Sequence, residues 1–306
     1  MRYVFIINPI AGKDKGKEKL SDAIKNFFKD KDLEFSISFS DYRGNITEIA
    51  RSEAEKGDDV TIFACGGEGT SFEVLNGIYG YDNAVMGVIP CGSANDFLRF
   101  FDCKDSFLDL EQQLEGETVS MDIIRAGDKY CLNGCSVGMD AIVAKNMILY
   151  KNLPFVSGGL AYKLAIIKAF LGKIGLKLKL KLDNTDLGER DCLFAVISNA
   201  PFYGGGFMGA PDAVPNDNIL NFTLVDTISR LKILRFLPVY EKGKHRNLSF
   251  CTMKECSKLE IESDLELPIN LDGEVIMAKS FDFELIKNGI KFLLPKKALK
   301  KLALKV

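Results

Sequence analysis

The chain has a single histidine, His245, among its 306 residues. A Ser-His-Asp hydrolase, a Cys-His protease or a His-ligated metal enzyme would each depend on that residue, which lies in a polar, loop-like stretch. We therefore expect carboxylates to carry any acid–base chemistry. The chain also has no large excess of positive or negative charge, because its formal net charge is −2. The chain thus has no general footprint for nucleic acid.

Long hydrophobic runs are absent as well. No segment approaches the apolar length that crosses a bilayer, and the strand-like RYVFIIN begins at residue 2, which leaves no room for a signal peptide. We expect a cytoplasmic protein, with peripheral association at the inner face of the membrane as a further expectation. The eight cysteines are scattered through apolar stretches without matched zinc spacing, a pattern typical of reduced and mostly buried thiols.

The length and the 47% hydrophobic content favour two domains. The first third alternates short apolar runs with helix-like segments, which predicts a parallel sheet covered by helices. In such sheets ligands bind at the carboxyl ends of the strands. The predicted strands cover 4–7, 35–40, 60–65 and 85–90, and the predicted helices cover 17–29, 45–56 and 71–79.

From about residue 121 the pattern changes to short strands with few helices between them. This pattern predicts an antiparallel sandwich or barrel, with LKLKLKL (176–182) burying one face and exposing lysines on the other. One helix is expected at 158–174, and a basic amphipathic helix at 295–306. We predict an α/β nucleotide-binding domain at 1–122, with segment 295–306 packing back on it, and a β-sandwich lipid-binding domain at 123–294.

Three glycine-rich segments follow predicted strands of the first domain: NPIAGKDKGK (8–17), GGEGTS (66–71) and PCGSAND (90–96). Glycine lets the main chain approach a phosphate closely. Each segment alone has an ordinary explanation, as a solvated loop, a tight turn or a helix cap. Two such turns with hydroxyl and carboxylate groups at adjacent strand ends favour a shared nucleotide site.

The second domain has two further candidate segments. The glycine-rich loop 199–218 carries Asp217, which with neighbouring carbonyl oxygens could hold Mg²⁺; a loop without any ligand is the alternative. The sequence LDGE (271–274) places two acids around a glycine, although DGE alone is also an ordinary hairpin turn.

These motifs, in this order, resemble the diacylglycerol kinase catalytic-domain family and in particular its soluble bacterial lipid kinases. The resemblance covers essentially the whole chain and is carried by NPIAGK, GGEGT, PCGSANDF, CSVGMDA (135–141), NAPFYGGGFMGAPDA and LDGE. It implies an α/β plus all-β fold that is NAD kinase/diacylglycerol kinase-like. ATP would bind between the two domains, and the C-terminus would return to the first.

The resemblance also implies roles for individual residues. Glu274 would be the general base, with Glu68 as the other candidate for that role, and Asp96 and Asp122 would be members of an acidic network near the phosphates. The implied Mg²⁺ ligands are Asp217 and the carbonyls of Val214 and Ile219. The implied nucleotide contacts are Asn8, Pro9, Gly12, Ser40, Gly66, Gly67, Glu68, Gly69, Thr70, Ser71, Phe72 and Ser93.

The chain departs from the family pattern at several of these positions. Glu68 replaces the usual Asp, Ser93 a Thr and Ala11 a Ser. Asn218 stands where Gly often follows the metal-binding Asp, and Asn tolerates the left-handed conformation best after Gly.

The function expected from the resemblance is transfer of the ATP γ-phosphoryl group to a lipid hydroxyl, most readily that of diacylglycerol, to give phosphatidic acid. An NAD kinase-like enzyme, or a non-catalytic lipid or nucleotide sensor of the same fold, remains the alternative. The expected partner is a lipid substrate presented at a membrane surface rather than nucleic acid, and a homodimer is left open.

Overall fold

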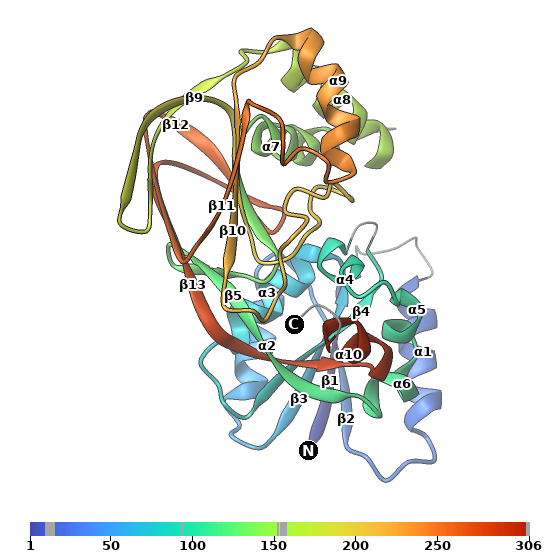
Figure 1. Cartoon of the computed structure of the whole chain (residues 1–306). Helices are drawn as coiled ribbons and strands as arrows, with labels where there is room; N and C mark the ends of the chain where they lie inside the picture. The colour runs from blue at the N-terminus through green and yellow to red at the C-terminus, as the bar shows by residue number, and fades with distance from the viewer. Residues whose placement is uncertain (10–15, 93–94, 152, 154–157, 304–306) are drawn as a thin grey trace. The chain divides into compact units, whose positions relative to one another are not determined.

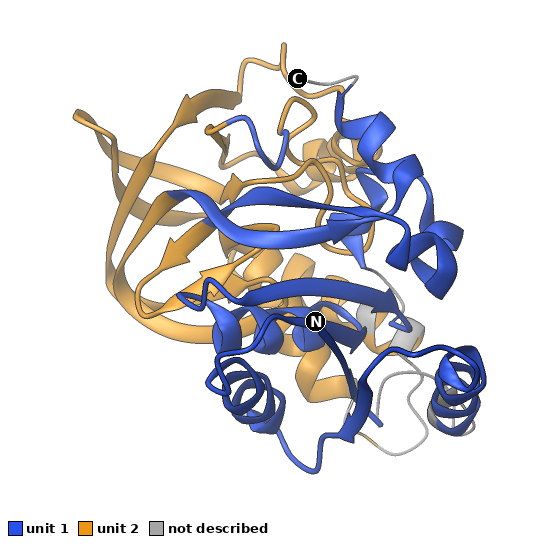
Figure 2. Cartoon of the chain, turned by 90° about the horizontal axis from the view of Figure 1, so that it is seen from below, with its two compact units in different colours: residues 1–123, 214–217, 286–306 blue, residues 124–213, 218–285 orange. Residues whose placement is uncertain are grey.

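The structure is a computed structural model that describes residues 1–9, 16–92, 95–151, 153 and 158–303. The chain divides into two compact units, which Figure 2 colours separately. Unit 1 comprises Met1–Ile123, Val214–Asp217 and Ile286–Val306, and unit 2 comprises Ile124–Ala213 and Asn218–Leu285. Unit 1 is therefore assembled from three separate segments of the chain.

A parallel sheet forms the centre of unit 1 (Figure 1), with its first four strands in the order β2-β1-β3-β4. These strands are β1 (Arg2–Ile7), β2 (Phe35–Phe39), β3 (Val60–Gly66) and β4 (Ala84–Pro90). The last part of β13 (Glu274–Leu294) lies parallel to β4, with Phe292 beside Met86. β3 is buried at every position, as expected for a central strand with both faces covered. The predicted parallel sheet is confirmed.

Helices cover this sheet on both faces. The steps from β1 to β2 and from β2 to β3 run in opposite directions along the sheet, so right-handed crossovers place the first two helices on opposite faces. Gly77 lets α3 approach α2 closely, because a Cβ there would lie 2.7 Å from the Cβ of Ala50. The helices of unit 1 are α1 (Gly16–Phe28), α2 (Asn45–Ala54), α3 (Glu68–Ile78), α4 (Asp96–Arg99), α5 (Lys104–Leu108), α6 (Leu110–Leu114) and α10 (Lys296–Ala303).

The core of unit 1 joins the beginning and the end of the chain. Phe5 of β1 stacks on Phe63 of β3 with ring centroids 4.7 Å apart, and Phe28 of α1 meets Phe5 edge-on. Leu293 of β13 packs in the same buried cluster. Leu302 of α10 is also buried, so the C-terminal segment contributes apolar surface to unit 1.

Unit 2 is mainly antiparallel and forms the β-sandwich half of the fold. Two of its strands, β9 (Thr185–Ser198) and β12 (Lys258–Leu271), are long enough to bend between layers. One part of each pairs with β7 and the other part pairs with β8. The remaining strands of unit 2 are β6 (Lys129–Cys131), β7 (Gly134–Gly138), β8 (Leu176–Leu182), β10 (Leu220–Asp226) and β11 (Cys251–Cys256), together with the first part of β13. β5 (Glu117–Ala126) begins in unit 1, and only its last three residues belong to unit 2.

The alternation predicted for β8 is confirmed. Leu178, Leu180 and Leu182 are buried, while the three lysines between and before them are exposed. Apolar and charged side chains therefore sort to opposite faces of this strand, as the two-residue period requires.

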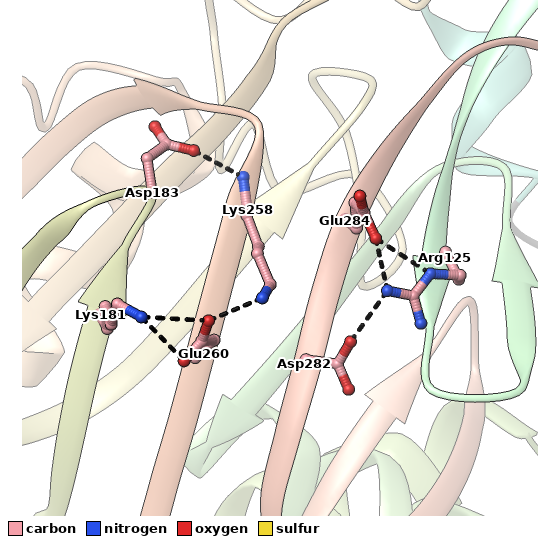
Figure 3. Close-up of polar contacts among 7 residues, drawn as sticks. All are labelled: Arg125, Lys181, Asp183, Lys258, Glu260, Asp282 and Glu284. Carbon is pink, nitrogen blue, oxygen red and sulfur yellow. Dashed lines mark hydrogen bonds and ion pairs between the residues drawn. The ribbon is translucent and has the colours of Figure 1, made fainter.

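Charged side chains tie neighbouring strands of unit 2 together on their outer surface (Figure 3). Arg125 of β5 bonds to Glu284 and, at 3.1 Å, to Asp282, both on β13. Glu260 of β12 accepts from Lys258 at 2.7 Å and from Lys181 of β8 at 3.5 Å. Opposite charges on adjacent strands support one pairing register.

Three helices accompany these strands: α7 (Met139–Lys151), α8 (Gly158–Leu171) and α9 (Arg230–Glu241). The expectation of a single helix in this region is wrong. In α9 the buried residues Ile233, Phe236 and Tyr240 follow helical spacing, although Pro238 lies within the helix and weakens that pattern in the sequence. Among the described residues, no helix is both long and apolar enough to cross a membrane.

Candidate functional site

The carboxyl ends of β1 and β3 lie side by side, and the chain leaves them in opposite directions along the sheet. These two strands are neighbours, but β2 lies beyond β1 on one side and β4 lies beyond β3 on the other. Ligands of open α/β sheets bind at such a switch point, outside the carboxyl ends of the strands. Asn8 bridges the two ends: its N–H donates to the carbonyl of Cys65 at 3.1 Å, and its Nδ2 donates to Thr70 Oγ1 at 3.2 Å.

Two glycine turns pack directly against each other at this edge. The N–H groups of Cys91 and Gly92 both donate to the carbonyl of Gly66, each at 3.0 Å. A Cβ on Gly92 would lie 2.5 Å from the Cα of Gly67, and a Cβ on Gly66 would lie 2.2 Å from Thr70 Oγ1. Positions 66 and 92 therefore have no room for a side chain. The structure brings together the two turns that the sequence places at adjacent strand ends.

Helix α3 begins inside this pair of turns. Gly67 is its N-cap, in an extended conformation and without a side-chain cap, and Ser71 N–H donates to the Gly67 carbonyl at 3.1 Å. The first N–H groups of a helix lack partners within the helix and carry its positive dipole end, so they attract anions. Phe72 is buried one turn later and anchors the helix in the unit.

Glu68 links the two turns through its side chain. Its Oε1 accepts the N–H of Asp96 at 2.9 Å. Asp96 is itself fully buried and forms an ion pair with Arg99 at 2.7 Å. Asn95, just before it, adopts a left-handed conformation with φ of 53°. The carboxylate of Glu68 thus has a structural task at the start of α4, in addition to any chemical one.

Glu73 of α3, which no sequence motif singles out, ties the loop after β2 to this helix. Ser40 is nearly buried, and its N–H donates to the carbonyl of Ile7 at 3.1 Å. Glu73 Oε2 accepts the N–H of Gly44 at 3.1 Å, and the Glu73 carbonyl accepts from Thr47 Oγ1 at 2.9 Å. An acid within the first two turns of the helix that follows a glycine turn is the signal that could have identified Glu73.

The segment Val214–Asp217 joins unit 1 through Asp122. The N–H of Asp122 donates to the carbonyl of Pro215 at 2.8 Å, and its Oδ1 accepts the N–H of Asn288 at 2.8 Å. Asp122 is almost completely buried. The main chain of Asp122 therefore holds the loop that carries the candidate metal ligands, while its carboxylate accepts from Asn288.

These residues suit a hard cation. Asp217 supplies a carboxylate and Val214 a carbonyl, and oxygen donors are what Mg²⁺ prefers. The side-chain oxygen of Asn216 is buried without a hydrogen-bond partner, an oxygen atom that could serve such a cation. Asn218 has φ of 64°, the left-handed conformation expected when Asn replaces Gly here. Within the described ranges, no group of three or more His, Cys, Asp or Glu side chains could hold a metal, so carbonyl oxygens would be needed.

In unit 2, Glu274 follows a tight hairpin turn. Leu271 and Glu274 are paired across it, and the two residues between them, Asp272 and Gly273, both have positive φ, at 49° and 92°. This is the combination that a two-residue hairpin with the right-handed twist of a sheet requires. The turn places Glu274 at the first position of β13.

Asp272 anchors this turn and was missed as a separate residue within LDGE. Its carboxylate accepts the backbone N–H groups of Leu132 at 2.5 Å, Asn133 at 3.1 Å and Gly134 at 2.8 Å. Burial raises the pKa of Asp272 to about 6, while these three hydrogen bonds act in the opposite direction. The Asp272 carboxylate thus adds to the main-chain bond from the Asp272 N–H to the Gly134 carbonyl in holding this turn to the start of β7.

The other motifs of unit 2 meet in a buried polar interior. Asn199 N–H donates to the Asn133 carbonyl at 2.8 Å, and the hydroxyls of Tyr203 and Tyr240 are 2.9 Å apart. The aromatic ring of Tyr240 lies 4.5 Å from that of His245, which is fully buried. Burial raises the pKa of Asp140 to about 6 and lowers the pKa of His245. The lone histidine lies in the loop after α9, as predicted, but its side chain is buried.

The predicted site residues fall into three groups. Gly12 and Ser93 lie outside the described residues. Ile219, next to β10, and Glu274 belong to unit 2. Asn8, Pro9, Ser40, Gly66 through Phe72, Val214 and Asp217 belong to unit 1, where the contacts above join Asn8 to the Gly66–Thr70 turn.

Two protein families match successive parts of the chain. Residues 2–126 match the diacylglycerol kinase catalytic domain, and residues 133–293 match the YegS C-terminal NAD kinase beta sandwich-like domain. Together the two matches span both halves of the fold.

Similar proteins agree with these two family matches. The chain is 28% identical over 302 residues to "Putative lipid kinase YtlR" of Bacillus subtilis, covering 91% of this chain and 95% of that protein. It is 31% identical over 238 residues to "Probable lipid kinase YegS-like" of Shewanella frigidimarina, covering 75% of each. The solved structure of "a putative diacylglycerol kinase from Bacillus anthracis str. Sterne" superposes with a TM-score of 0.74 at 19% identity, over 96% of this chain and 97% of that one, which shows a shared fold.

Proposed function

We propose a function from one premise: this chain belongs to the diacylglycerol kinase catalytic-domain family of bacterial lipid kinases. The proposed reaction is transfer of the γ-phosphoryl group of ATP to a hydroxyl group of a lipid. Diacylglycerol is the proposed acceptor, and phosphatidic acid the product.

One observation carries this proposal. The glycine turns after β3 and β4 pack main chain against main chain beside the N-terminus of α3, at the switch point of the sheet. Such a surface offers N–H groups and space to a polyphosphate. Packing accounts for Gly66 and Gly92 but not for Gly67, where a Cβ would have room, and a phosphate close to the main chain would account for that glycine.

Each residue has a proposed role in phosphoryl transfer. The N–H groups from Gly66 to Thr70 would bind phosphate oxygens and orient the γ-phosphorus for in-line attack. The lipid oxygen forms the new bond to phosphorus, the bond from phosphorus to the ADP oxygen breaks, and the proton of the hydroxyl passes to the carboxylate of Glu274. A carboxylate is a weak base towards an alcohol, so this proton moves only as the new bond forms.

Mg²⁺ is the proposed cofactor, with Asp217 and the carbonyls of Val214 and Ile219 as its protein ligands. When bound, it would neutralise charge on the polyphosphate. Asp122 would then act by fixing the Val214–Asp217 segment, through its bond to the Pro215 carbonyl.

The test is an assay of the purified chain with labelled ATP, Mg²⁺ and separate acceptors. Phosphorylated diacylglycerol is the expected product. Labelling of NAD instead would identify an NAD kinase-like enzyme. Binding of lipid or nucleotide without any labelled product would identify a sensor of the same fold, and either result would refute the proposal.

Conservative variants separate the roles of the two glutamates. Glu274→Gln should lower kcat by about 10²–10⁴-fold if Glu274 is the base, whereas Glu266→Gln, an exposed change on β12, should leave kcat unchanged. Glu68→Gln keeps an oxygen that can accept the Asp96 N–H, and Glu68→Ala does not. A loss of activity in both Glu68 variants indicates that its charge matters, and a loss only in Glu68→Ala indicates a purely structural role.

We further propose that the enzyme works in the cytoplasm at the inner face of the membrane, because its acceptor would reside in the bilayer. Radiolabelled phosphatidic acid should then appear in the vesicle fraction of the assay and not in the aqueous supernatant.

A further inference from the structure

Strand β2 lies at the edge of the parallel sheet of unit 1, and its sequence is a palindrome. The strand reads FSISF over Phe35–Phe39, with Ile37 at its centre. In the described part of the chain it pairs with β1 and with no other strand. The second edge of β2 therefore presents main-chain N–H and C=O groups to which no strand is paired.

The register with β1 determines which residues of β2 face this open edge. Tyr3 N–H donates to the carbonyl of Glu34 at 3.0 Å, and Ser40 N–H donates to the carbonyl of Ile7 at 3.1 Å. In a parallel ladder the residues that bond to one neighbour alternate along the strand, so the even-numbered residues of β2 bond to β1. The main-chain groups at the open edge are those of Phe35, Ile37 and Phe39.

The open edge of β2 lacks the features that commonly keep edge strands apart. Such strands often carry charged side chains, proline or a bulge, each of which opposes pairing with another chain. β2 has no charged residue and no proline, and its register with β1 is continuous. By contrast β11, an edge strand of unit 2, carries the exposed Lys254 and Glu255. The edge of β2 is thus suited to accept a further strand.

Apolar side chains gather at the same edge. Phe39 is 42% exposed, and Leu33 and Tyr42, close to it in sequence, are 39% and 59% exposed. Phe35 stacks on Phe28 of α1 with ring centroids 4.6 Å apart. Alternate residues of a strand share a face, so Phe39 continues the apolar face that Phe35 begins. The exposed ring of Phe39 is apolar surface that a partner would cover.

We propose that β2 is the interface of a homodimer, in which the β2 strands of two copies pair antiparallel about a twofold axis at Ile37. In this register Phe35 lies opposite Phe39 of the second copy, and Ile37 lies opposite Ile37 of the second copy. These residues form the hydrogen-bonded pairs, because their N–H and C=O groups face the open edge. The Phe39 ring then packs beside Phe35 of the second copy. This inference goes beyond the proposed function, and the pairing requires no catalysis.

The palindrome favours a second copy of the chain over a strand of another protein. A twofold interface brings each surface against an identical one, so it must match itself. In β2 each residue type meets its own type, and no charge meets a like charge. Two strands of five residues bury less surface than a stable interface needs, so we expect a dissociation constant of about 1–100 µM.

The first test is sedimentation equilibrium of the full chain from about 1 µM to about 300 µM. The mean mass should rise with concentration from that of one chain towards that of two. Phe39→Lys should raise the dissociation constant at least about tenfold, because pairing would bury a charge without a partner. Leu108→Lys changes an exposed leucine of α5 in the same unit and should dimerise as the unaltered protein does. Unchanged melting temperatures would show that both variants are folded.

The second test measures the register. In the proposed pairing, residue 36 of one copy lies opposite residue 38 of the other in a pair without hydrogen bonds, with Cα atoms about 4.5 Å apart. A disulfide spans that distance. Ser36→Cys/Ser38→Cys should therefore form covalent dimers under mild oxidation by copper–phenanthroline, seen on a non-reducing gel. The two single variants should form them when mixed and not when separate, and the unaltered protein, with its eight cysteines, is the control.

Three results would overturn the proposal. They are a single-chain mass over the whole concentration range, a dimer that Phe39→Lys leaves as strong as before, and cross-linking of Ser36→Cys alone as efficient as that of the double variant. The last result would mean that two copies meet in another register. None of these results bears on phosphoryl transfer, which the assay with labelled ATP tests separately.

Discussion

At the residue scale, the glycines after β3 and β4 meet two different demands. Gly66 and Gly92 are required by packing, since a Cβ on either would lie within 2.5 Å of a neighbouring atom. A Cβ on Gly67 would meet its nearest atom, the Cα of Gly92, at 3.5 Å, which is an ordinary contact. Its φ of −102° is also open to other residues. Packing alone therefore does not explain a glycine at position 67.

We expect Gly67→Ala to fold normally and to bind nucleotide poorly. The added methyl group would stand in front of the first N–H groups of α3, so the KM for ATP should rise about tenfold or more. Gly92→Ala should instead lower the free energy of unfolding by about 1–3 kcal/mol, because it overpacks the contact with Gly67. Steady-state kinetics and urea unfolding of both variants check this pair, and an unchanged KM in Gly67→Ala would contradict the phosphate site.

Two buried carboxyl groups make stability depend on pH. Burial raises the pKa of Asp140 and of Asp272 to about 6, well above the ordinary value of an aspartic acid. The folded state therefore binds these protons more tightly than the unfolded state does. Between about pH 4 and pH 6 each group makes the free energy of unfolding fall as pH rises, and above that window its cost is constant.

Asp140→Asn should remove the part of this pH dependence that is due to Asp140. The variant and the unaltered protein should differ little near pH 4, and the variant should gain stability up to about 3 kcal/mol above pH 6. His245, whose pKa burial lowers, contributes in the opposite direction but is present in both proteins, so the difference isolates Asp140. Urea unfolding from pH 4 to pH 8 measures it; a difference that does not vary with pH would rule out this role.

At the scale of elements, ion pairs across strands matter less than the buried contacts. Arg125 joins β5 to β13 through two carboxylates, as Figure 3 shows, but these three side chains are 31–44% exposed. Water and salt weaken such pairs. Their contribution is to the register of the strands more than to the total stability.

Arg125→Met should accordingly lower the free energy of unfolding by only about 1 kcal/mol at low salt. The loss should shrink at high salt, because screening weakens the pair in the unaltered protein. Urea unfolding at two ionic strengths tests this, with Lys129→Met, on the neighbouring strand β6, as the control. A loss of several kcal/mol that ignores salt would show that Arg125 supports packing and not an ion pair.

At the scale of the whole molecule, unit 1 depends on both ends of the chain. Its sheet takes a strand from β13, its buried cluster includes Leu293, and Asp122 recruits Val214–Asp217 from the middle of the sequence. Binding of nucleotide and metal to unit 1 should therefore stabilise a structure that draws on all three segments. A ligand that binds only the folded state stabilises it by mass action.

We expect Mg²⁺ with a non-hydrolysable ATP analogue to raise the free energy of unfolding by about 2.7 kcal/mol at a hundred times Kd. Removal of the metal with EDTA should abolish most of this gain. Asp217→Asn should respond to the nucleotide but no longer to Mg²⁺, whereas Asp264→Asn, on an exposed part of β12, should behave as the unaltered protein. Thermal unfolding measures both, and full Mg²⁺ dependence in Asp217→Asn would remove that residue from the metal site.

The sequence by itself determined the local structure of unit 1 and the motifs of the site. Hydrophobic periodicity and glycine position act over a few residues, so the parallel strands, the helix starts and the glycine turns could be predicted. The loop position of His245 could also be predicted, but its burial could not, because that depends on rings from α9, a helix whose proline obscures its pattern.

Only the tertiary structure decided which groups meet. Asn8 and Thr70 are 62 residues apart in sequence, and Asp272 and Leu132 are 140 apart, yet each pair forms a hydrogen bond. The same limit applies to α8, because the sequence indicates an apolar helix but not which of its faces is covered by α7. Contacts between distant segments depend on how whole elements pack, and no local pattern contains that information.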